Sequence, residues 1–320
     1  MQATARAQPN IALIKYWGKR DRTLNLPAVG SISITLADLY TEMNVKFDSK
    51  LKDDVLTVNG EIDQQMLPRI SRCLSAVAGE GRDPARVDSH CNFPVAAGLA
   101  SSASAFAALV VAASAAAGQH RSTAELASLA GLESGSAARS LYGGFAELEN
   151  NGDSVAVETL LDSSDWPLRI VIAVTSAGPK PVSSGEAMEI SRKTSPFYGR
   201  WVDDQTHDLD VARAAIRERD FGKLAAIAEH NCLKMHSVMW ASRPPIVYWN
   251  AATLECLQTV RELRTQGVGV FFTIDAGPQV KAICLAHDES RVCDALQSTS
   301  GVGRVIVSEL GAGAKLTGCV

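Results

Sequence analysis

A run of small residues at 92–106, NFPVAAGLASSASAF, has the composition of a phosphate-binding loop that leads into a helix. Small residues let the backbone approach a ligand closely, and the first N–H groups of a helix have no partner within the helix. The helix dipole also favours an anion at that end. Ser101 and Ser102 add hydroxyl groups for a phosphate or for a magnesium ion. The segment matches neither the P-loop motif GxxxxGK[ST] nor the dinucleotide-binding motif GxGxxG. The alternative to a phosphate site is therefore that the glycine and serines only cap a packed helix.

A second candidate is the basic segment NIALIKYWGKRDRTLNLP at 10–27. Its cations, Lys15, Lys19, Arg20 and Arg22, surround Tyr16 and Trp17 in an otherwise mildly acidic chain. Lysine offers a mobile point charge, arginine a planar fork and tyrosine a hydroxyl donor, which together suit a polyphosphate. The alternative is a solvated basic turn with an aromatic anchor.

Two serine-containing segments could bind further anionic groups. In ESGSAARSLYGGF at 133–145, Ser134, Ser136 and Arg139 partly share one side of a short predicted helix and could bind a carboxylate. The alternative is a surface arginine on a Ser-rich helix start. In VSSGEAM at 182–188, Ser183 and Ser184 precede a helix and could bind a phosphate or cap that helix.

A single aspartate, Asp275, ends an apolar strand in TIDAGPQ at 273–279. A carboxylate there is costly if it is buried without a partner. We interpret it as a base or an orienting group for a substrate hydroxyl, kept ionised by a nearby lysine or arginine. The alternative is an Asx-type turn residue. The sequence has no HExxH or GxSxG motif, so we predict neither a zinc site nor a hydrolase triad.

The pattern of the remaining residues predicts an α+β fold with two lobes. Residues 29–36 and 43–58 are β-branched and roughly alternating, which predicts strands. The Ala-rich segment 101–118 predicts a helix buried on most sides. Further predicted helices are 122–131, 133–141, 208–239 and 247–266, and further predicted strands are a hairpin at 145–160 and the segments 168–176, 268–274, 280–286 and 304–310. The polar DSSDWP stretch predicts a boundary near 160–168, between lobes 1–166 and 167–320.

Composition excludes several classes of protein. The 320 residues are 46% hydrophobic and 21% charged, enough for a full core, and the net charge of −4 argues against a nucleic-acid binder. No signal-peptide pattern or membrane-length apolar run occurs, so we expect a cytoplasmic protein without membrane contact. The seven scattered cysteines are interpreted as reduced thiols.

Taken in order, these segments closely resemble the diphosphomevalonate decarboxylases of the superfamily that includes galactokinase, homoserine kinase and mevalonate kinase. The resemblance rests on NIALIKYWGKRD, NFPVAAGLASSASAFAAL, DSSDWP, GSAARSLYGGF and DAGP. It implies the GHMP-kinase-like fold, with the active site between two lobes, and a homodimer. It implies ATP-dependent conversion of mevalonate 5-diphosphate to isopentenyl diphosphate, ADP, phosphate and carbon dioxide, with Mg²⁺ bound alongside ATP.

The resemblance also implies roles for individual residues. Asp275 would orient or deprotonate the C3 hydroxyl, and Lys15 would neutralise charge near the transferred phosphoryl group. The ATP phosphates would contact Gly98, Leu99, Ala100, Ser101 and Ser102, Ser102 being also catalytic. The substrate diphosphate would contact Tyr16, Lys19, Ser183 and Ser184. The carboxylate would be positioned by Arg139, Ser134 and Ser136, and Asn10 would support Asp275 or Arg139.

Three departures from the family pattern leave alternatives open. The usual NSSIS is VGSIS here, the residue after DAGP is Gln279, and Pro179-Lys180 replaces a common lysine pair. These changes leave the strictness for a 5-diphosphate over a 5-monophosphate undecided. The alternatives are therefore a mevalonate 5-phosphate decarboxylase, a mevalonate 3-kinase, or an inactive phosphate-binding or regulatory homologue.

Overall fold

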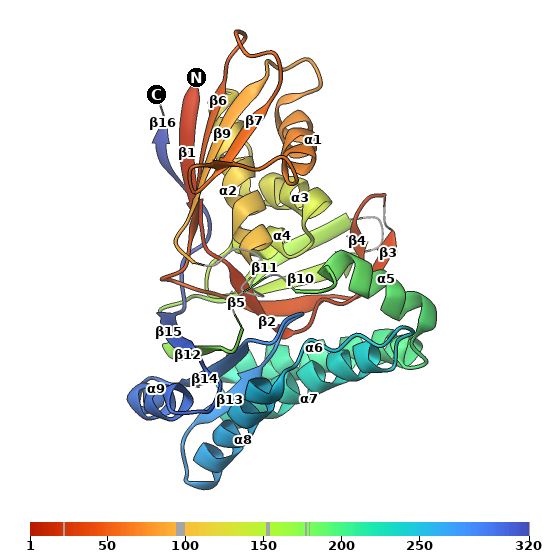
Figure 1. The fold of residues 1–320 in the computed structure, drawn as a ribbon, viewed down its shortest axis with the longest axis vertical. Coiled ribbons are helices and arrows are strands. Elements are labelled where there is room, and N and C mark those ends of the chain that lie inside the picture. The colour runs from red at the N-terminus through yellow and green to blue at the C-terminus, as the bar shows by residue number, and fades with distance from the viewer. Residues whose placement is uncertain (22, 94–99, 152–153, 177, 179, 320) are drawn as a thin grey trace.

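The computed structural model describes residues 1–21, 23–93, 100–151, 154–176, 178 and 180–319. Gly98 and Leu99, two of the predicted nucleotide-binding residues, lie outside the described residues. Within these ranges the chain forms three sheets of four or more strands and a short two-stranded ribbon, with helices packed between and outside them (Figure 1). The prediction of an α+β fold is confirmed.

The first sheet lies at the end of the molecule that carries both termini (Figure 1). Its strands, in spatial order, are β16 (Lys315–Cys319), β1 (Gln2–Ala7), β6 (Thr41–Phe47), β9 (Ala85–Cys91), β7 (Val55–Val58) and β8 (Glu61–Ile62). All neighbours are antiparallel except β7 and β9. One face packs against α1 (Leu67–Ala78) and α2 (Ser101–Ala116), and α3 (Thr123–Glu133) and α4 (Ala137–Ser140) pack against α2 in the same core.

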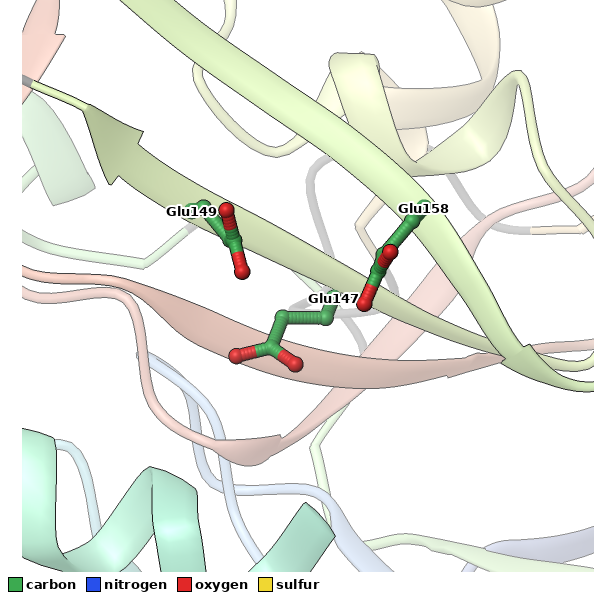
Figure 2. Close-up of side chains that lie close together, drawn as sticks. All are labelled: Glu147, Glu149 and Glu158. Atoms are coloured by element: carbon green, nitrogen blue, oxygen red, sulfur yellow. The ribbon is translucent and has the colours of Figure 1, made fainter.

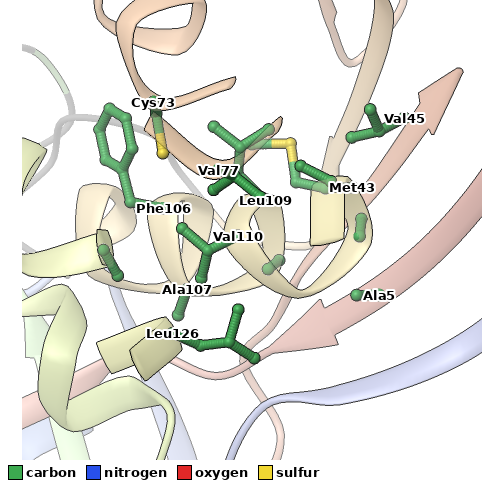
Figure 3. Close-up of a cluster of buried hydrophobic side chains, with 14 of the residues drawn as sticks. Ala5, Met43, Val45, Cys73, Val77, Phe106, Ala107, Leu109, Val110 and Leu126 are labelled. Atoms are coloured by element: carbon green, nitrogen blue, oxygen red, sulfur yellow. The ribbon is translucent and has the colours of Figure 1, made fainter. Parts of the chain in front are cut away.

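Helix α2 is the centre of the first hydrophobic core. Figure 3 shows Phe106, Leu109 and Val110 of α2 among side chains from the sheet and from the neighbouring helices α1 and α3. All three are fully buried, and burial of such a side chain stabilises a fold by about 1.5–3 kcal/mol. The many alanines let the sheet and helices approach α2 closely. The predicted burial of this helix on most sides is confirmed.

Two four-stranded antiparallel sheets form the rest of the framework. One has the order β11 (Ser154–Leu161), β10 (Phe145–Asn151), β5 (Ser31–Thr35) and β2 (Asn10–Ile14). The other has the order β13 (Val270–Thr273), β14 (Val280–Leu285), β12 (Leu168–Val174) and β15 (Arg304–Glu309). The ribbon is β3 (Lys19–Asp21) with β4 (Leu26–Pro27). A second core, which includes Ile34, Phe145 and Phe271, joins these two sheets.

The second half of the chain supplies the remaining helices. They are α5 (Ser184–Thr194), α6 (Tyr198–Glu218), α7 (Phe221–Trp240), α8 (Ala251–Thr265), the 3₁₀ turn η1 (Ala286–Asp288) and α9 (Glu289–Gln297). Helices α6 and α7 lie against the sheets that carry β2 and β13 (Figure 1). Among the helices that the structure describes, none combines the length and apolar character needed to cross a membrane.

Several predicted boundaries were wrong for local reasons. The predicted strand 43–58 is two strands, β6 and β7. The predicted helix 208–239 is two helices, because Arg219 adopts a left-handed φ of 54° and Asp220 caps the next helix. The segment 133–141 is not one helix: Glu133 ends α3, Ser134 has an extended backbone, and only α4 (Ala137–Ser140) follows. The 145–160 hairpin is confirmed by the pairing of β10 with β11, although Gly152 lies outside the described residues.

Several elements were not predicted, among them β1, β2, α1, β9, α9 and β16. Strand β16 is exposed along its whole length and is held by pairing with β1, so its sequence KLTGC carries no core-facing pattern. It brings the end of the chain back to the first sheet, beyond the boundary predicted at 160–168. The division into lobes 1–166 and 167–320 stays a prediction.

Three carboxylates gather on one face of the hairpin: Glu147 and Glu149 of β10 and Glu158 of β11 (Figure 2). Glu147 is buried, and Arg213 of α6 binds it through two hydrogen bonds of 2.9 and 2.7 Å. Both oxygens of the most buried carboxylate are thus bound by a guanidinium group. We interpret the pair as a structural link between α6 and the hairpin.

We predict that Arg213→Met lowers the free energy of unfolding by about 3 kcal/mol, because it leaves the Glu147 carboxylate buried without a cation. Urea unfolding measures this. The matched control is Arg200→Met on the same helix, where Arg200 is 79% exposed and pairs with Asp204; its expected loss is below about 0.5 kcal/mol. Equal losses in the two variants would contradict the interpretation.

His236 is a buried histidine in α7. Its Nε2 lies 3.2 Å from the carbonyl oxygen of Ile274, and its ring packs 4.7 Å from that of Trp249. Burial lowers the pKa of His236 to about 3. The unfolded chain therefore binds a proton below the usual histidine pKa of about 6.5 that the folded protein does not.

It follows that the stabilisation from neutral His236 is complete above pH 6.5 and is lost as the pH falls toward 3. Between pH 7.5 and pH 5, His236 should account for about 2 kcal/mol of the fall in unfolding free energy. Urea unfolding at the two pH values measures this. The fall in unfolding free energy between pH 7.5 and pH 5 should be smaller by about 2 kcal/mol in His236→Asn than in the original protein. If His230→Asn, which changes an exposed histidine of the same helix, removes the same share, burial of His236 is not the cause.

Candidate active site

Asp275 lies two residues after β13 and is bound by two lysines from different elements. Lys15, which follows β2, places its Nζ 2.7 Å from Oδ1 of Asp275, and Lys281 of β14 places its Nζ 3.3 Å from Oδ2. Both lysine side chains are buried, whereas a quarter of the Asp275 side chain is exposed. Lys15 also donates to the carbonyl oxygen of Ala12 at 2.8 Å. One carboxylate is thus held by an ammonium group on each oxygen.

These lysines determine the ionisation of Asp275. Burial by itself would raise the pKa of the carboxyl group, but Lys15 and Lys281 outweigh burial and hold that pKa well below its usual range. Asp275 is therefore a carboxylate throughout the physiological range. A carboxylate of such low pKa is a poor general base, since efficient bases have pKa values near the operating pH. It is better suited to orient a hydroxyl group and to fix local charge.

Arg139 of α4 is a buried cation whose described partners are neutral. Its Nε donates to Ser33 Oγ at 2.9 Å, its Nη1 to Ser31 Oγ, and its Nη2 to Asn10 Oδ1 at 3.3 Å. Burial lowers its pKa to about 10, so it stays charged at neutral pH. Within the described residues no carboxylate lies at salt-bridge distance from Arg139. A buried charge of this kind is costly, so the arrangement favours an anionic ligand beside it.

Asn10 connects Arg139 with the neighbouring serines. Its Nδ2 donates to the carbonyl oxygen of Ser136 at 2.9 Å and to Ser140 Oγ at 2.8 Å, while its Oδ1 faces Arg139. Of the two expected partners, Asn10 therefore contacts Arg139. Ser31 and Ser33, which accept hydrogen bonds from Arg139, belong to the VGSIS segment that stands where the family usually has NSSIS. The two sequences differ only before Ser31, so both hydroxyl groups that bind Arg139 are present here.

A chain of hydroxyl groups joins the start of α2 to the start of α4. Ser102 Oγ lies 3.4 Å from Ser134 Oγ, which lies 3.3 Å from Ser136 Oγ. Ala100, the residue before α2, has a left-handed φ of 56° that turns the chain into the helix. The structure thus brings Ser102, in the described part of the predicted phosphate loop, next to the predicted carboxylate segment. Ser101 and Ser102 both lie in the first turn of α2.

Two tyrosine hydroxyl groups are buried without a described partner. They belong to Tyr16 and Tyr198, and an unpaired buried hydroxyl group costs about 1–3 kcal/mol. Burial raises the pKa of Tyr16 to about 12, so its phenol stays protonated. A Cβ atom at Gly135 would lie 2.3 Å from Tyr16 Oη, so any side chain there would force Tyr16 to move. The two hydroxyl groups are available as donors to a ligand.

The remaining predicted phosphate ligands lie on β3 and at the start of α5. Lys19 lines a hollow of about 110 Å³ together with Gly185, Met188 and Glu189 of α5. Ser183 accepts a hydrogen bond from the backbone N–H of Glu186 at 3.2 Å and caps α5, as one of the two interpretations predicted. Ser184 Oγ instead lies 2.6 Å from Nζ of Lys180.

Two lysines of the site were not identified from the sequence. Lys281 is fully buried beside Asp275, and a charged residue inside the apolar strand VKAICL is a signal that could have revealed it. Lys180 donates to the carbonyl oxygen of Ala276 at 3.1 Å, and burial lowers its pKa to about 8. In the sequence, Lys180 stands out only as part of a departure from a family pattern. Its role depends on tertiary contacts between the loop before α5 and the loop after Asp275.

Comparison with known proteins identifies relatives of this chain. Residues 7–158 match the model of the diphosphomevalonate decarboxylase-like N-terminal domain, and residues 170–314 match that of the mevalonate 5-diphosphate decarboxylase C-terminal domain. The chain is 36% identical to the diphosphomevalonate decarboxylase of Eremothecium gossypii, over 93% of this chain and 81% of that protein. It is 32% identical to that of Candida albicans, over 98% of both chains.

Solved structures are similar over nearly the whole chain. Mevalonate diphosphate decarboxylase from Staphylococcus aureus superposes with a TM-score of 0.93 at 37% identity, covering 99% of this chain and 98% of that one. The protein named MDDEF, in complex with MVAPP, AMPPCP and magnesium, superposes with a TM-score of 0.92 at 35% identity and the same coverage. The fold is therefore the GHMP-kinase-like fold of these enzymes, and the chain belongs to the diphosphomevalonate decarboxylase family.

Proposed function

We propose that this protein catalyses the ATP-dependent decarboxylation of mevalonate 5-diphosphate to isopentenyl diphosphate, ADP, phosphate and carbon dioxide. The observation that carries the proposal is the pairing of two features in a member of this family. One is the Asp275 carboxylate held between Lys15 and Lys281, and the other is the buried Arg139, which has no carboxylate at salt-bridge distance among the residues that the structure describes. They suit a substrate that carries both a hydroxyl group to be phosphorylated and a carboxylate to be lost.

The nucleotide phosphates are proposed to bind at the start of α2. The first-turn N–H groups, the left-handed turn at Ala100 and the hydroxyl groups of Ser101 and Ser102 fit a magnesium-bound triphosphate. Gly98 and Leu99 stay predicted parts of this loop. Bound ATP supplies the phosphoryl group and Mg²⁺ offsets its negative charge. Ser102, one hydroxyl contact away from Ser134, connects this loop to the substrate side of the site.

Asp275 and Lys15 are proposed to act at the C3 hydroxyl group. Asp275 accepts a hydrogen bond from this hydroxyl and aims its oxygen at the phosphoryl group, while Lys15 neutralises charge on the oxygens being transferred. Phosphoryl transfer depends mostly on positioning and charge stabilisation, so a carboxylate of low pKa is sufficient. As the new P–O bond forms, the P–O bond to ADP breaks, and the hydroxyl proton passes to Asp275 along their hydrogen bond.

Arg139 is proposed to position the substrate carboxylate, together with Ser134 and Ser136. When the C3 phosphate leaves, positive charge develops at C3 and the C–C bond to the carboxylate breaks, which releases carbon dioxide and forms the double bond. Ser31, Ser33 and Asn10 already occupy much of the guanidinium group. This limits how strongly Arg139 stabilises the carboxylate in the ground state, which would otherwise slow its loss.

The 5-diphosphate is proposed to bind where Tyr16, Lys19 and Ser184 meet the start of α5. The hydroxyl oxygen of Ser183 already accepts a hydrogen bond from the N–H of Glu186, so Ser183 supports the site by capping α5. Binding of the second phosphate at this end favours the diphosphate over the 5-monophosphate.

We further propose a cytoplasmic homodimer with lobes 1–166 and 167–320. Light scattering at micromolar concentration checks the assembly.

The proposal predicts equal amounts of ADP and carbon dioxide when the purified protein is incubated with Mg-ATP and mevalonate 5-diphosphate. Asp275→Ala should lower both by at least about 10³-fold, because it removes the group that orients the nucleophile. Asp53→Ala, at an exposed aspartate, is the matched control and should change neither. Formation of ADP without carbon dioxide would indicate a mevalonate 3-kinase. Faster turnover of mevalonate 5-phosphate than of the 5-diphosphate would show that the 5-monophosphate is the substrate. No turnover of either compound would favour the inactive homologue.

Gly135→Ala should raise KM for mevalonate 5-diphosphate about tenfold, because the new methyl group displaces Tyr16 and removes one hydrogen bond of about 1.4 kcal/mol. KM for ATP should change little. Gly131→Ala is the matched control, since its Cβ would meet only Ala138 Cβ, at an ordinary 3.9 Å. Steady-state kinetics with each substrate varied in turn measures both. A rise in KM for ATP alone would exclude Tyr16 as a ligand of the substrate.

A further inference from the structure

Lys15 leaves the sheet before its side chain reaches Asp275. Strand β2 pairs with β5 through Ile14, with an irregular register between Ala12 and Ile14, and Lys15 is the next residue. Its backbone groups are buried beyond the end of the strand, and buried backbone groups need partners. Those partners come from two helices in the second half of the chain, more than 180 residues away.

Asn231 of α7 and Gln205 of α6 provide these partners. The N–H of Lys15 donates to Asn231 Oδ1 at 2.7 Å, and Gln205 Nε2 donates to the carbonyl oxygen of Lys15 at 2.8 Å. The same Nε2 donates to the carbonyl oxygen of Gly30 at 3.1 Å. Both amide side chains are fully buried. The backbone of Lys15 is therefore held on both sides.

The hydrogen bonds around Asn231 allow only one orientation of its amide. Its Nδ2 donates to Asp208 Oδ2 at 2.6 Å and to Gln205 Oε1 at 3.0 Å. A rotated amide would place its oxygen against the Asp208 carboxylate and leave the N–H of Lys15 without an acceptor. Lys234 binds the same carboxylate at 2.8 Å and balances its charge. Asp208 thus directs the acceptor of Asn231 toward Lys15.

The same helix also holds the backbone next to Asp275. Cys232, adjacent to Asn231, accepts from the N–H of Ile274 at 3.2 Å, and His236, one turn later, contacts the carbonyl oxygen of Ile274. Helix α7 therefore binds Lys15 through Asn231 and the residue before Asp275 through Cys232 and His236. Because a packed helix is rigid, α7 fixes the backbone positions of both Lys15 and the residue before Asp275 relative to each other.

We propose that Asn231, oriented by Asp208 and Gln205, is a positioning residue that fixes Lys15 against Asp275, with α7 as the shared support. The structural part of this inference is independent of the proposed function. Only one consequence rests on that function, namely that phosphoryl transfer slows when Lys15 loses its position against Asp275. Asn231 touches no reacting atom. It acts through the backbone of Lys15.

Asn231→Leu tests this, because leucine has a similar volume and no acceptor. We expect kcat to fall about ten- to a hundredfold with KM for both substrates nearly unchanged, since misplacing a reacting group by about 1 Å can cost about 10²-fold. In a Lys15→Met background the same change should lower the residual rate less than about twofold, because its effect passes through Lys15. An equal fall in both backgrounds would overturn the inference.

A second measurement does not depend on turnover. Acetylation of Lys15 in the ligand-free protein, followed by mass spectrometry and referenced to Lys180 in the same sample, should be faster in Asn231→Leu than in the original protein. Unchanged labelling of Lys15 would overturn the inference even if no substrate is turned over, whereas faster labelling without turnover would refute only the proposed function.

Two further variants control for folding. Asp208→Asn keeps the size of the side chain and lets the Asn231 amide rotate, so it should act in the same direction to a smaller extent if Asn231→Leu does not fold. Ser237→Ala, at an exposed residue of α7 whose hydroxyl donates to the carbonyl oxygen of Leu233, should leave kcat and labelling unchanged. A loss of kcat in Ser237→Ala equal to that of Asn231→Leu would mean that general disturbance of α7 is the cause, and would overturn the inference.

Discussion

The ionic contact of Asp275 with Lys15 and Lys281 is the constraint on which the rest of the structure depends. Two buried ammonium groups and one carboxylate are stable together only if each is held at short distance, because an isolated buried charge is costly. Lys15 directly follows β2, and Lys281 lies in β14. The contact therefore requires that β2 and the sheet containing β13 and β14 stay in fixed relation.

The hydrophobic cores meet this requirement. Phe145 and Ile34 pack with Phe271 between the two four-stranded sheets, and α6 and α7 cover the junction. The first core, around α2, fixes the helix start that faces Ser134. Arg139 lies between these regions, with its guanidinium group bound to β5 and β2. Apolar packing thus sets the positions of charges that come from distant parts of the sequence.

Local patterns predicted the elements whose burial is visible in their own residues. The Ala-rich α2, the β10–β11 hairpin and the apolar strands β12 and β14 are of this kind. The patterns failed where partners decide the structure: β16 is exposed and exists because β1 pairs with it. They also failed at the break between α6 and α7, because Arg219 is an ordinary helix former that here takes a left-handed conformation.

The sequence by itself determined which groups are present: an aspartate after an apolar strand, a basic segment, a serine-rich helix start and an arginine beside serines. It also identified the family, since these motifs occur in a characteristic order. Only the tertiary structure decided that Lys281 shares Asp275 with Lys15, that Asn10 binds Arg139, and that Asn231 holds the backbone of Lys15. These contacts join residues far apart in the chain, and their distances depend on how sheets and helices pack, which no local pattern encodes.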